Sequence, residues 1–276
     1  YHKVVIRYPL FDPVLWLFLK NKNQIITEHH TKELDELKVM GDQRYLMEKT
    51  LGNWWLKKFG GLIAVTNEIV EYEIKRSGFI KATAFIPNSI PHISSTQKTE
   101  IGSQDEMIRM IMVANFRPWH GLDIIIEGLK NHPTLPFELH LVGDIPEKQK
   151  EILQSFYQVQ TYGHLQYVEI ESLYKKMDIG LAGYNLQSKN MEEATSLKVR
   201  EYLANGLGVV LGYRDPAFPK DFKYGLTTEN FNIPVILSFG KEMKKVSKSE
   251  IIQQAEPYIS SKYVLKKLYD FCIKQE

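Results

Sequence analysis

Short apolar runs alternate with stretches of helical periodicity along most of this sequence, and this rhythm restricts the folds open to it. The clearest runs lie at 108–114, 137–142, 159–162, 178–182 and 208–212. Such alternation is typical of βαβ units, in which helices cover the faces of a parallel sheet. Because 276 residues exceed what one hydrophobic core usually serves, we expect two α/β domains.

The remaining elements follow the same rhythm, with a polar Ser/Thr/Gln-rich linker expected at 91–106. Residues 213–256 give weak signals. We expect an N-terminal domain at 1–104, a C-terminal domain at 105–256 and a terminal helix at 257–276. The other expected strands are at 4–8, 24–28, 61–66 and 83–86, and the expected helical stretches at 32–58, 67–77, 121–130, 146–157, 167–176, 196–205 and 260–273.

Composition and the absence of certain motifs exclude several classes of protein. A net charge of +2 gives no reason to expect a nucleic-acid partner. The single cysteine, Cys272, excludes a disulfide framework within one chain and suits a reducing cytoplasm. No Gly-x-Gly-x-x-Gly follows a strand, which disfavours a dinucleotide oxidoreductase, and no Gly-x-Ser-x-Gly elbow is present. The chain starts at Tyr1 directly in a strand-like run, so we expect the start of the N-terminal domain to be missing.

Residues 193–212, EATSLKVREYLANGLGVVLG, contain the most specific pattern in the chain. At helical spacing, Lys198, Glu201 and Asn205 share one narrow stripe. The amino end of this helix, at Ser196 and Leu197, follows a strand, where backbone N–H groups and the helix dipole favour a phosphate. The pattern alone leaves two interpretations open: a ligand site, or a surface Lys–Glu ion pair.

EATSLKVREYLANGLGVV also resembles the signature of the retaining glycosyltransferases of family 4, whose GT-B fold has two Rossmann-like domains facing a cleft. Glu193 and Glu201 have the spacing of the two glutamates of that family. The resemblance implies that Glu193 is catalytic and faces the donor sugar, whereas Glu201 holds the ribose. The form from Ser196 to Tyr202 is similar to a variant in capsule and lipopolysaccharide enzymes.

Four other segments resemble the same family in the correct order: GLIAVTNEIVEYEIKRSGFIKATAFIPNSI, IMVANFRPWHGLDIIIEGL, FELHLVGD and TYGHLQYVEIESLYKKMDIGLAGY. Many members carry an Arg and a Lys in the first loop of the C-terminal domain, where this chain has Asn115 and His120. Arg117 is a candidate to replace the arginine. The resemblance implies further donor contacts near the second and third strands, at Gly143 and at the loop Gly163, His164 and Leu165.

Two segments of the N-terminal domain are candidates for acceptor or membrane contacts. ITEHHT at 26–31 ends a strand, and family members often place a His-containing loop there, so His29 is a candidate catalytic residue; a structural or solvated histidine is the alternative. The spacing of His29 and His30 supplies no third ligand in register, and no Asp-x-Asp element is present, so we expect metal independence. NWWLKKFGG at 53–61 could touch a membrane surface or end a packed helix.

The resemblance implies a retaining, hexosyltransferase-type enzyme whose terminal helix at 257–276 packs back toward the N-terminal domain. The expectation of metal independence comes from the residues themselves. The enzyme would move a sugar from a UDP- or GDP-linked donor to a hydroxyl of a capsular, exopolysaccharide or lipopolysaccharide glycan, free or lipid-linked. We expect no cofactor, and a cytoplasmic location with a peripheral contact at the inner face of the cell membrane. Two alternatives remain open at this point: a non-catalytic protein that binds nucleotide sugars, and a sugar-nucleotide epimerase of the same fold.

Overall fold

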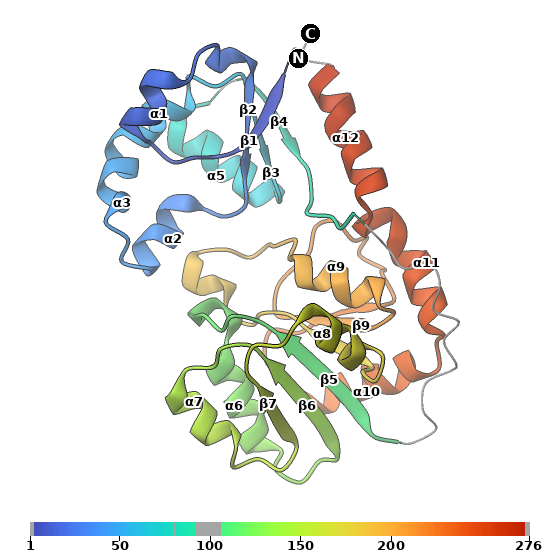
Figure 1. Ribbon diagram of the computed structural model, residues 1–276. Helices are drawn as coiled ribbons and strands as arrows, with labels where there is room; N and C mark the ends of the chain where they lie inside the picture. Colours follow the sequence, from blue (N-terminus) through green and yellow to red (C-terminus); the bar gives the residue numbers. More distant parts are fainter. Residues whose placement is uncertain (1–2, 80, 92–105, 274–276) are drawn as a thin grey trace. The chain divides into compact units, whose positions relative to one another are not determined.

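The computed structural model describes residues 3–79, 81–91 and 106–273 and divides into two compact α/β units (Figure 1). Unit 1 comprises Tyr1–Asn88, Gln187–Thr195 and Val264–Glu276, and unit 2 comprises Ser89–Leu186 and Ser196–Tyr263. The expected domain boundary at 104/105, and nearly all of the expected linker, lie outside the described residues. The expected C-terminal domain at 105–256 is interrupted, because residues 187–195 cluster with unit 1.

Unit 1 is built on a parallel sheet of four strands in the order β1-β2-β3-β4. All four strands were expected from their apolar runs, within one or two residues at each end. The strands are β1 (Val4–Arg7), β2 (Ile25–His29), β3 (Gly61–Ala64) and β4 (Ala82–Phe85), and the helices are α1 (Pro13–Phe18), α2 (Glu33–Val39), α3 (Arg44–Met47), α4 (Asn53–Leu56) and α5 (Asn67–Ser77), with a π-helical turn at Glu48–Gly52.

The terminal helix α12 (Ser261–Ile273) completes the core of unit 1. Its Val264 is buried in one cluster with Ile26, Ile63 and Ile86 of the sheet strands and the segment after β4. Leu268, Phe271 and Cys272 pack on the same cluster. Tyr263 and Leu265 of the same helix are exposed, so only part of its apolar side chains face this core.

Unit 2 contains a six-stranded parallel sheet in the order β10-β9-β8-β5-β6-β7, which is the Rossmann order 3-2-1-4-5-6 read from its other edge. The order in which strands are added to the sheet reverses between the neighbouring strands β5 and β8. Sheets of this kind bind ligands beyond the carboxyl ends of the two strands at such a point. The strands are β5 (Ile108–Val113), β6 (Phe137–Val142), β7 (Val159–Tyr162), β8 (Ile179–Leu181), β9 (Gly208–Leu211) and β10 (Gly225–Thr227), and the helices are α6 (Leu122–Asn131), α7 (Glu147–Leu153), α8 (Tyr167–Tyr174), α9 (Leu197–Ala204), α10 (Ile233–Lys244) and α11 (Lys248–Ile259).

Three of these elements, β10, α10 and α11, fall in the region that gave weak sequence signals. β10 has only three residues, too few for a periodic pattern. Pro257 lies inside α11, where proline ordinarily argues against a helix. α11 nevertheless buries Ile251, Ile252 and Ala255 and packs on α9. Tertiary packing, rather than local propensity, decides these elements.

Two contacts fix α9 in unit 2. The hydroxyl of Tyr202 accepts a hydrogen bond from the backbone N–H of Val113, 2.9 Å away, at the end of β5. The fully buried Arg200 guanidinium makes a two-point ion pair with Asp215, with Nη2 3.1 Å from Oδ1 and Nη1 bonded to Oδ2. The helix ends at Asn205, and Gly206 follows with a φ of +71°, as expected for a residue beyond a helix terminus.

Asp215→Ala should destabilise the unit that contains α9 by about 3–5 kcal/mol, because it leaves the Arg200 charge buried without a partner. Urea denaturation of the full chain measures the loss. The exposed Asp221 is a matched control, and Asp221→Ala should change the free energy of unfolding by less than about 0.5 kcal/mol. Equal effects of the two substitutions would contradict a structural role for the ion pair.

Candidate functional site

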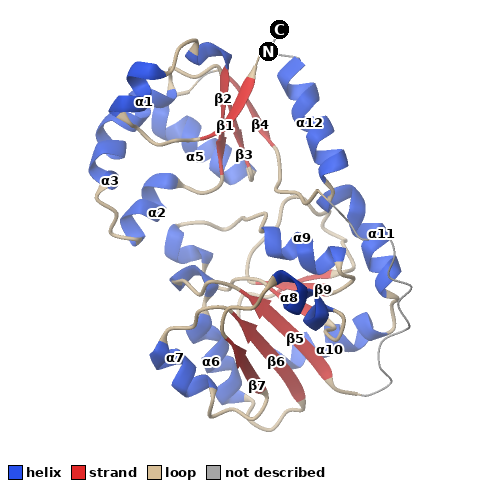
Figure 2. Ribbon diagram, viewed as in Figure 1, coloured by secondary structure: helices blue, strands red, loops and turns tan. Residues whose placement is uncertain are grey.

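The loops that leave the carboxyl ends of the unit 2 strands carry the donor-binding residues expected from the sequence. Figure 2 shows the arrowheads of β5 and β6 directed to the same edge of the sheet. Since every strand pair in this sheet is parallel, the loops after β5, β6 and β7 emerge at that edge. These loops contain Asn115, Arg117, His120, Gly143, Gly163, His164 and Leu165. The topology thus gathers residues that are dispersed in sequence.

Lys198 has an unusual environment at the beginning of α9. Its Nζ is buried and has no hydrogen-bond partner in the described part of the chain. Burial lowers the pKa of Lys198 to about 8, while the nearby Glu201 carboxylate opposes this change. Burial likewise raises the pKa of Glu201, which Lys198 opposes. A solvated surface ion pair, one of the two interpretations left open by the pattern, does not match a buried ammonium without a hydrogen bond.

The two ends of α9 differ in how their polar groups are satisfied. Ser196 occupies the N-cap position, but its side chain makes no capping hydrogen bond, and Leu197 beside it is exposed. At the other end, the Asn205 side chain donates to the Glu201 carbonyl oxygen, 2.8 Å away. Asn205 therefore caps the helix, although the sequence placed it on the same stripe as Lys198. The amino end of α9 thus has no side-chain cap.

The loop after β5 holds its histidine in a defined orientation. The backbone N–H of Arg117 donates to Nδ1 of His120 over 2.9 Å. With Nδ1 used as an acceptor, the neutral His120 ring carries its hydrogen on Nε2. Asn115 and Arg117 are exposed, so this loop presents one cationic and two polar side chains at the ligand edge of unit 2.

Gly143 joins the loops after β5, β6 and β7. Its φ is +117°, and a Cβ at this position would lie 2.0 Å from the carbonyl oxygen of Ala114, so only glycine fits. Its N–H faces the carbonyl oxygens of Tyr162, at 3.2 Å, and Gly163, at 3.1 Å. Gly143 therefore has a structural role, whereas His164 beside this contact is exposed and lies 3.8 Å from Asp144.

Glu193, the expected catalytic residue, belongs to unit 1. Its backbone N–H and that of Glu192 donate to the Glu68 carboxylate over 2.8 and 3.0 Å. The Glu193 carboxylate accepts from the backbone N–H of Glu68 at 3.4 Å, in the first turn of α5. Lys189 of the same segment contacts Glu36 at 2.8 Å. The sequence analysis placed residues 187–195 in the same domain as α9, and here they make these contacts within unit 1.

His29 lies in the interior of unit 1. Its ring is fully buried and stacks on Tyr8, with the ring centroids 4.5 Å apart. Nε2 lies 3.1 Å from Thr27 Oγ1, and Nδ1 lies 3.1 Å from Glu33 Oε1. Burial lowers the pKa of His29 to about 4. A base that receives a proton from an acceptor hydroxyl must be reached by that hydroxyl. The His29 ring, which has no contact with solvent, does not meet this requirement.

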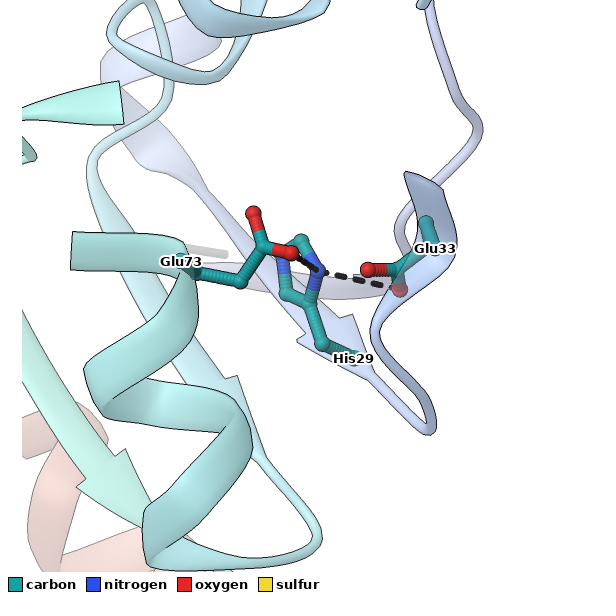
Figure 3. A group of neighbouring side chains, drawn as sticks. All are labelled: His29, Glu33 and Glu73. Carbon is teal, nitrogen blue, oxygen red and sulfur yellow. Dashed lines mark hydrogen bonds and ion pairs between the residues drawn. The ribbon is translucent and has the colours of Figure 1, made fainter. Parts of the chain in front are cut away.

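A side chain that is distant in the sequence also lies close to His29, and the spacing of residues did not reveal it. Glu73 of α5 places Oε1 4.0 Å from His29 Nδ1 (Figure 3). Burial raises the pKa of Glu33 to about 7 and that of Glu73 to about 8. The sequence had excluded a metal site here for want of a third ligand, and the packing of α5 supplies one. His30, in contrast, is partly exposed and pairs with Glu28 at 3.3 Å.

A cavity of about 350 Å³ lies next to this cluster in unit 1. It is located after the carboxyl ends of β1 and β2, where open α/β sheets bind ligands. Arg7 and Arg44 contribute cationic side chains to its wall, and Glu33 and Glu36 contribute carboxylates. This mixture of charges suits a polar, hydroxyl-rich molecule better than an apolar one.

Most of the aromatic-basic run at 53–61 is packed, but part of it borders an apolar surface. Trp55, Leu56 and Phe59 are fully buried, which agrees with the end of a packed helix. Trp54 is 42% exposed, and its ring lies 6.0 Å from that of Trp16 on α1. Other exposed apolar side chains of α1, α3 and the π-helical turn are Val14, Leu17, Phe18, Leu46, Met47 and Leu51. Among the described residues, no helix is both long and apolar enough to cross a membrane.

Comparison with known proteins identifies the fold. The sequence matches no family model and no curated protein. In structure, the chain is similar to the lipopolysaccharide outer core galactosyltransferase WaaB, with a TM-score of 0.63 and 13% identity over 91% of this chain and 68% of that one.

Two further solved structures are similar to this chain. Sucrose-phosphate synthase from Thermosynechococcus elongatus has a TM-score of 0.64 and 14% identity over 95% of this chain and 71% of that one. Anabaena HepE, solved with UDP and glucose, has a TM-score of 0.61 and 11% identity over 91% and 71%. Identities this low establish the fold rather than the substrate. The chain has the GT-B glycosyltransferase fold, with two Rossmann-like α/β units.

Proposed function

We propose that this protein is a glycosyltransferase that binds the diphosphate of a nucleotide sugar at the amino end of α9. The observation that carries the proposal is the buried Lys198 ammonium without a hydrogen-bond partner in the described chain. A buried cation is costly unless an anion pairs with it. The position of Lys198, at the ligand edge of a Rossmann-order sheet and beside a helix amino end, suits a diphosphate.

Neighbouring residues complete the proposed donor site. Ser196 and the backbone N–H of Leu197 lie at the helix amino end and would bond phosphate oxygens. Asn115, Arg117 and His120 would add donors from the loop after β5. Glu201 would accept from ribose hydroxyls, and the loop Gly163–Leu165, held by Gly143, would contact the base. UDP is the first nucleotide to test, because HepE, which has this fold, was solved with UDP and glucose.

For the transfer step, we assign Glu193 to the hydroxyls of the transferred sugar, with retention of the anomeric configuration. Unit 1 would hold the acceptor in the cavity lined by Arg7 and Arg44. The acceptor class we propose is a hydroxyl of a surface glycan, free or lipid-linked, in line with the similarity to a lipopolysaccharide galactosyltransferase. Catalysis would rest on positioning and on stabilising the departing diphosphate, without a metal ion or other cofactor. His29, which is buried, has no catalytic part in this proposal.

The first prediction concerns Lys198. Lys198→Met should weaken UDP binding by about 1.5–3 kcal/mol, roughly 10- to 150-fold, because a charge-assisted hydrogen bond is lost. Since burial lowers the pKa of Lys198 to about 8, the protonated form that an anion favours is depleted above that pH. Wild-type affinity for UDP should therefore fall as the pH rises from about 7 to about 9.

Isothermal titration and a thermal-shift panel of UDP, GDP, CMP and ADP measure both effects. Lys175, exposed after α8, is a matched control, and Lys175→Met should bind UDP like the wild type. A Lys198→Met protein with wild-type affinity, or no response to any of the nucleotides, would refute the proposed donor site.

The second prediction separates chemistry from binding. Glu193→Gln should lower turnover by about 10²-fold or more while nucleotide affinity changes less than about threefold, because the carboxylate acts on the transferred sugar. The adjacent Glu192 is exposed, and Glu192→Gln should leave turnover unchanged. Equal loss of binding and turnover would contradict the assignment. Binding without turnover in the wild type indicates a non-catalytic protein, and conversion of the donor without an acceptor indicates an epimerase.

We also propose that the exposed apolar surface around Trp16 and Trp54 contacts the membrane that carries a lipid-linked acceptor. Exposed lysines, Lys20, Lys49, Lys57 and Lys58, accompany it, and Lys58 lies over the Trp54 ring at 4.8 Å. Apolar side chains with cationic neighbours favour anionic lipid surfaces.

Sedimentation with vesicles containing phosphatidylglycerol tests this contact. Substitution of both Leu17 and Phe18 by Ser should reduce binding at least about fivefold, since each buried apolar side chain contributes roughly 1–2 kcal/mol. The control Tyr157→Ser, at an exposed residue of unit 2, should leave vesicle binding unchanged. Equal binding of the two variants, or no binding of the wild type, would rule out this surface.

A further inference from the structure

Three possible metal ligands from different elements converge inside unit 1. His29 ends β2, Glu33 begins α2 four residues later, and Glu73 lies on α5. Figure 3 shows the three side chains directed toward one another. His29 Nδ1 lies 3.1 Å from Glu33 Oε1 and 4.0 Å from Glu73 Oε1, and the ligand atoms all lie within 4.8 Å of one another.

The contact of His29 Nε2 on the far side of the ring bears on which ring nitrogen carries the hydrogen. The other nitrogen, Nδ1, faces the carboxylates. The hydroxyl of Thr27 donates to the carbonyl oxygen of Gly61 at 3.4 Å. In the tautomer with its hydrogen on Nε2, His29 donates to this Oγ1, 3.1 Å away. In the neutral ring this leaves a lone pair on Nδ1, directed at Glu33 and Glu73. Histidines that bind metals usually have their other N–H bonded in this way.

The carboxylates lack the donors that buried oxygen atoms require. Glu73 is fully buried, and its Oε1 has no hydrogen-bond partner among the described residues. Oε2 of Glu33 is also buried without one. A buried polar atom without a partner costs free energy. Three acceptor atoms that face one another therefore call for a proton or a metal cation between them.

The surrounding charges indicate how much positive charge is needed. Arg76 binds Glu73 Oε2 through Nη2 at 2.6 Å and Glu48 Oε1 through Nη1 at 2.9 Å. Glu48 also accepts from the Tyr8 hydroxyl and the Phe11 N–H. Three carboxylates thus face one guanidinium, which leaves two negative charges uncompensated when all are ionised. One divalent cation balances this charge.

We propose that His29, Glu33 and Glu73 bind a Zn²⁺ ion in the interior of unit 1, with a water molecule from the adjacent cavity as the fourth ligand. One imidazole and two carboxylates form a ligand set that zinc accepts, and bonds of about 2.0 Å in tetrahedral geometry place ligand atoms roughly 3.3 Å apart. The His29–Glu33 distance of 3.1 Å fits this value, whereas Glu73 Oε1, 4.0 Å from His29 Nδ1, would have to move closer by about 0.7 Å. Mg²⁺ and Ca²⁺ require more oxygen ligands or waters than this site offers.

The ion would tie β2, α2 and α5 together, and its route to the site is the cavity whose wall includes Glu33. This role is separate from donor binding, because the proposed donor site uses the residues of α9 and the loops of unit 2. Loss of the ion should lower the thermal stability of the chain, while the affinity for UDP stays the same.

The test uses the full chain, stripped with EDTA and dialysed. Titration with ZnCl₂ should load about one ion per chain and raise the Tm, since a ligand that binds only the folded state stabilises it. Glu33→Gln and Glu73→Gln should each weaken zinc binding at least about tenfold. His30→Gln and Glu71→Gln, which change exposed or partly exposed neighbours, are matched controls and should bind zinc like the wild type.

A second measurement needs no variant. Co²⁺ added to the stripped wild type should give the strong visible absorption of a tetrahedral site, and one equivalent of Zn²⁺ should abolish it. No zinc binding by the wild type, or equal binding by Glu73→Gln, would overturn the proposal. So would a Glu33→Gln protein that is more stable than the metal-free wild type and insensitive to zinc, because a proton shared between Glu33 and Glu73 then satisfies the cluster. UDP titration of each sample reports the donor site independently.

Discussion

The common direction of the strands in unit 2 is the constraint on which the candidate donor site depends. Parallel strands send all their carboxyl ends to one edge, so every following loop or helix must begin there. Residues 115–120, 143 and 163–165, together with the start of α9, meet at this edge although long helices separate them in sequence. Gly143 strengthens the arrangement, because its missing side chain lets the loops after β5 and β7 contact the turn after β6.

The helix α9 carries two buried cationic groups that differ in whether the protein supplies a partner for them. The protein itself satisfies Arg200, through the buried two-point ion pair with Asp215. Lys198, two residues earlier, has its ammonium buried with no hydrogen-bond acceptor in the described chain. A folded protein pairs its buried charges where it can. The contrast within one helix is therefore the physical reason to assign an external anion to Lys198.

The chain path divides the two glutamates that the family resemblance treats as one motif. Glu201 lies in unit 2, whereas Glu193 lies in a segment that unit 1 holds through Glu68, Glu36 and the carbonyl of Val65. The segment contributes several ionic and backbone contacts to unit 1, and none of them is visible in the spacing of the motif. A residue of the proposed transfer step is thus anchored to the amino end of α5 instead of to α9.

The sequence by itself determined the α/β class, most strands and helices, and the position of α9, because apolar runs of a buried parallel sheet and the stripe of a helix are local patterns. It did not predict α1, β10, α10 or α11, which are short or contain proline. It also could not pair Arg200 with Asp215, bury Lys198, or bring Glu73 to His29. Those relations depend on which surfaces pack together, and only the tertiary structure decides them, since burial and partnership are properties of the folded neighbourhood and not of residue spacing.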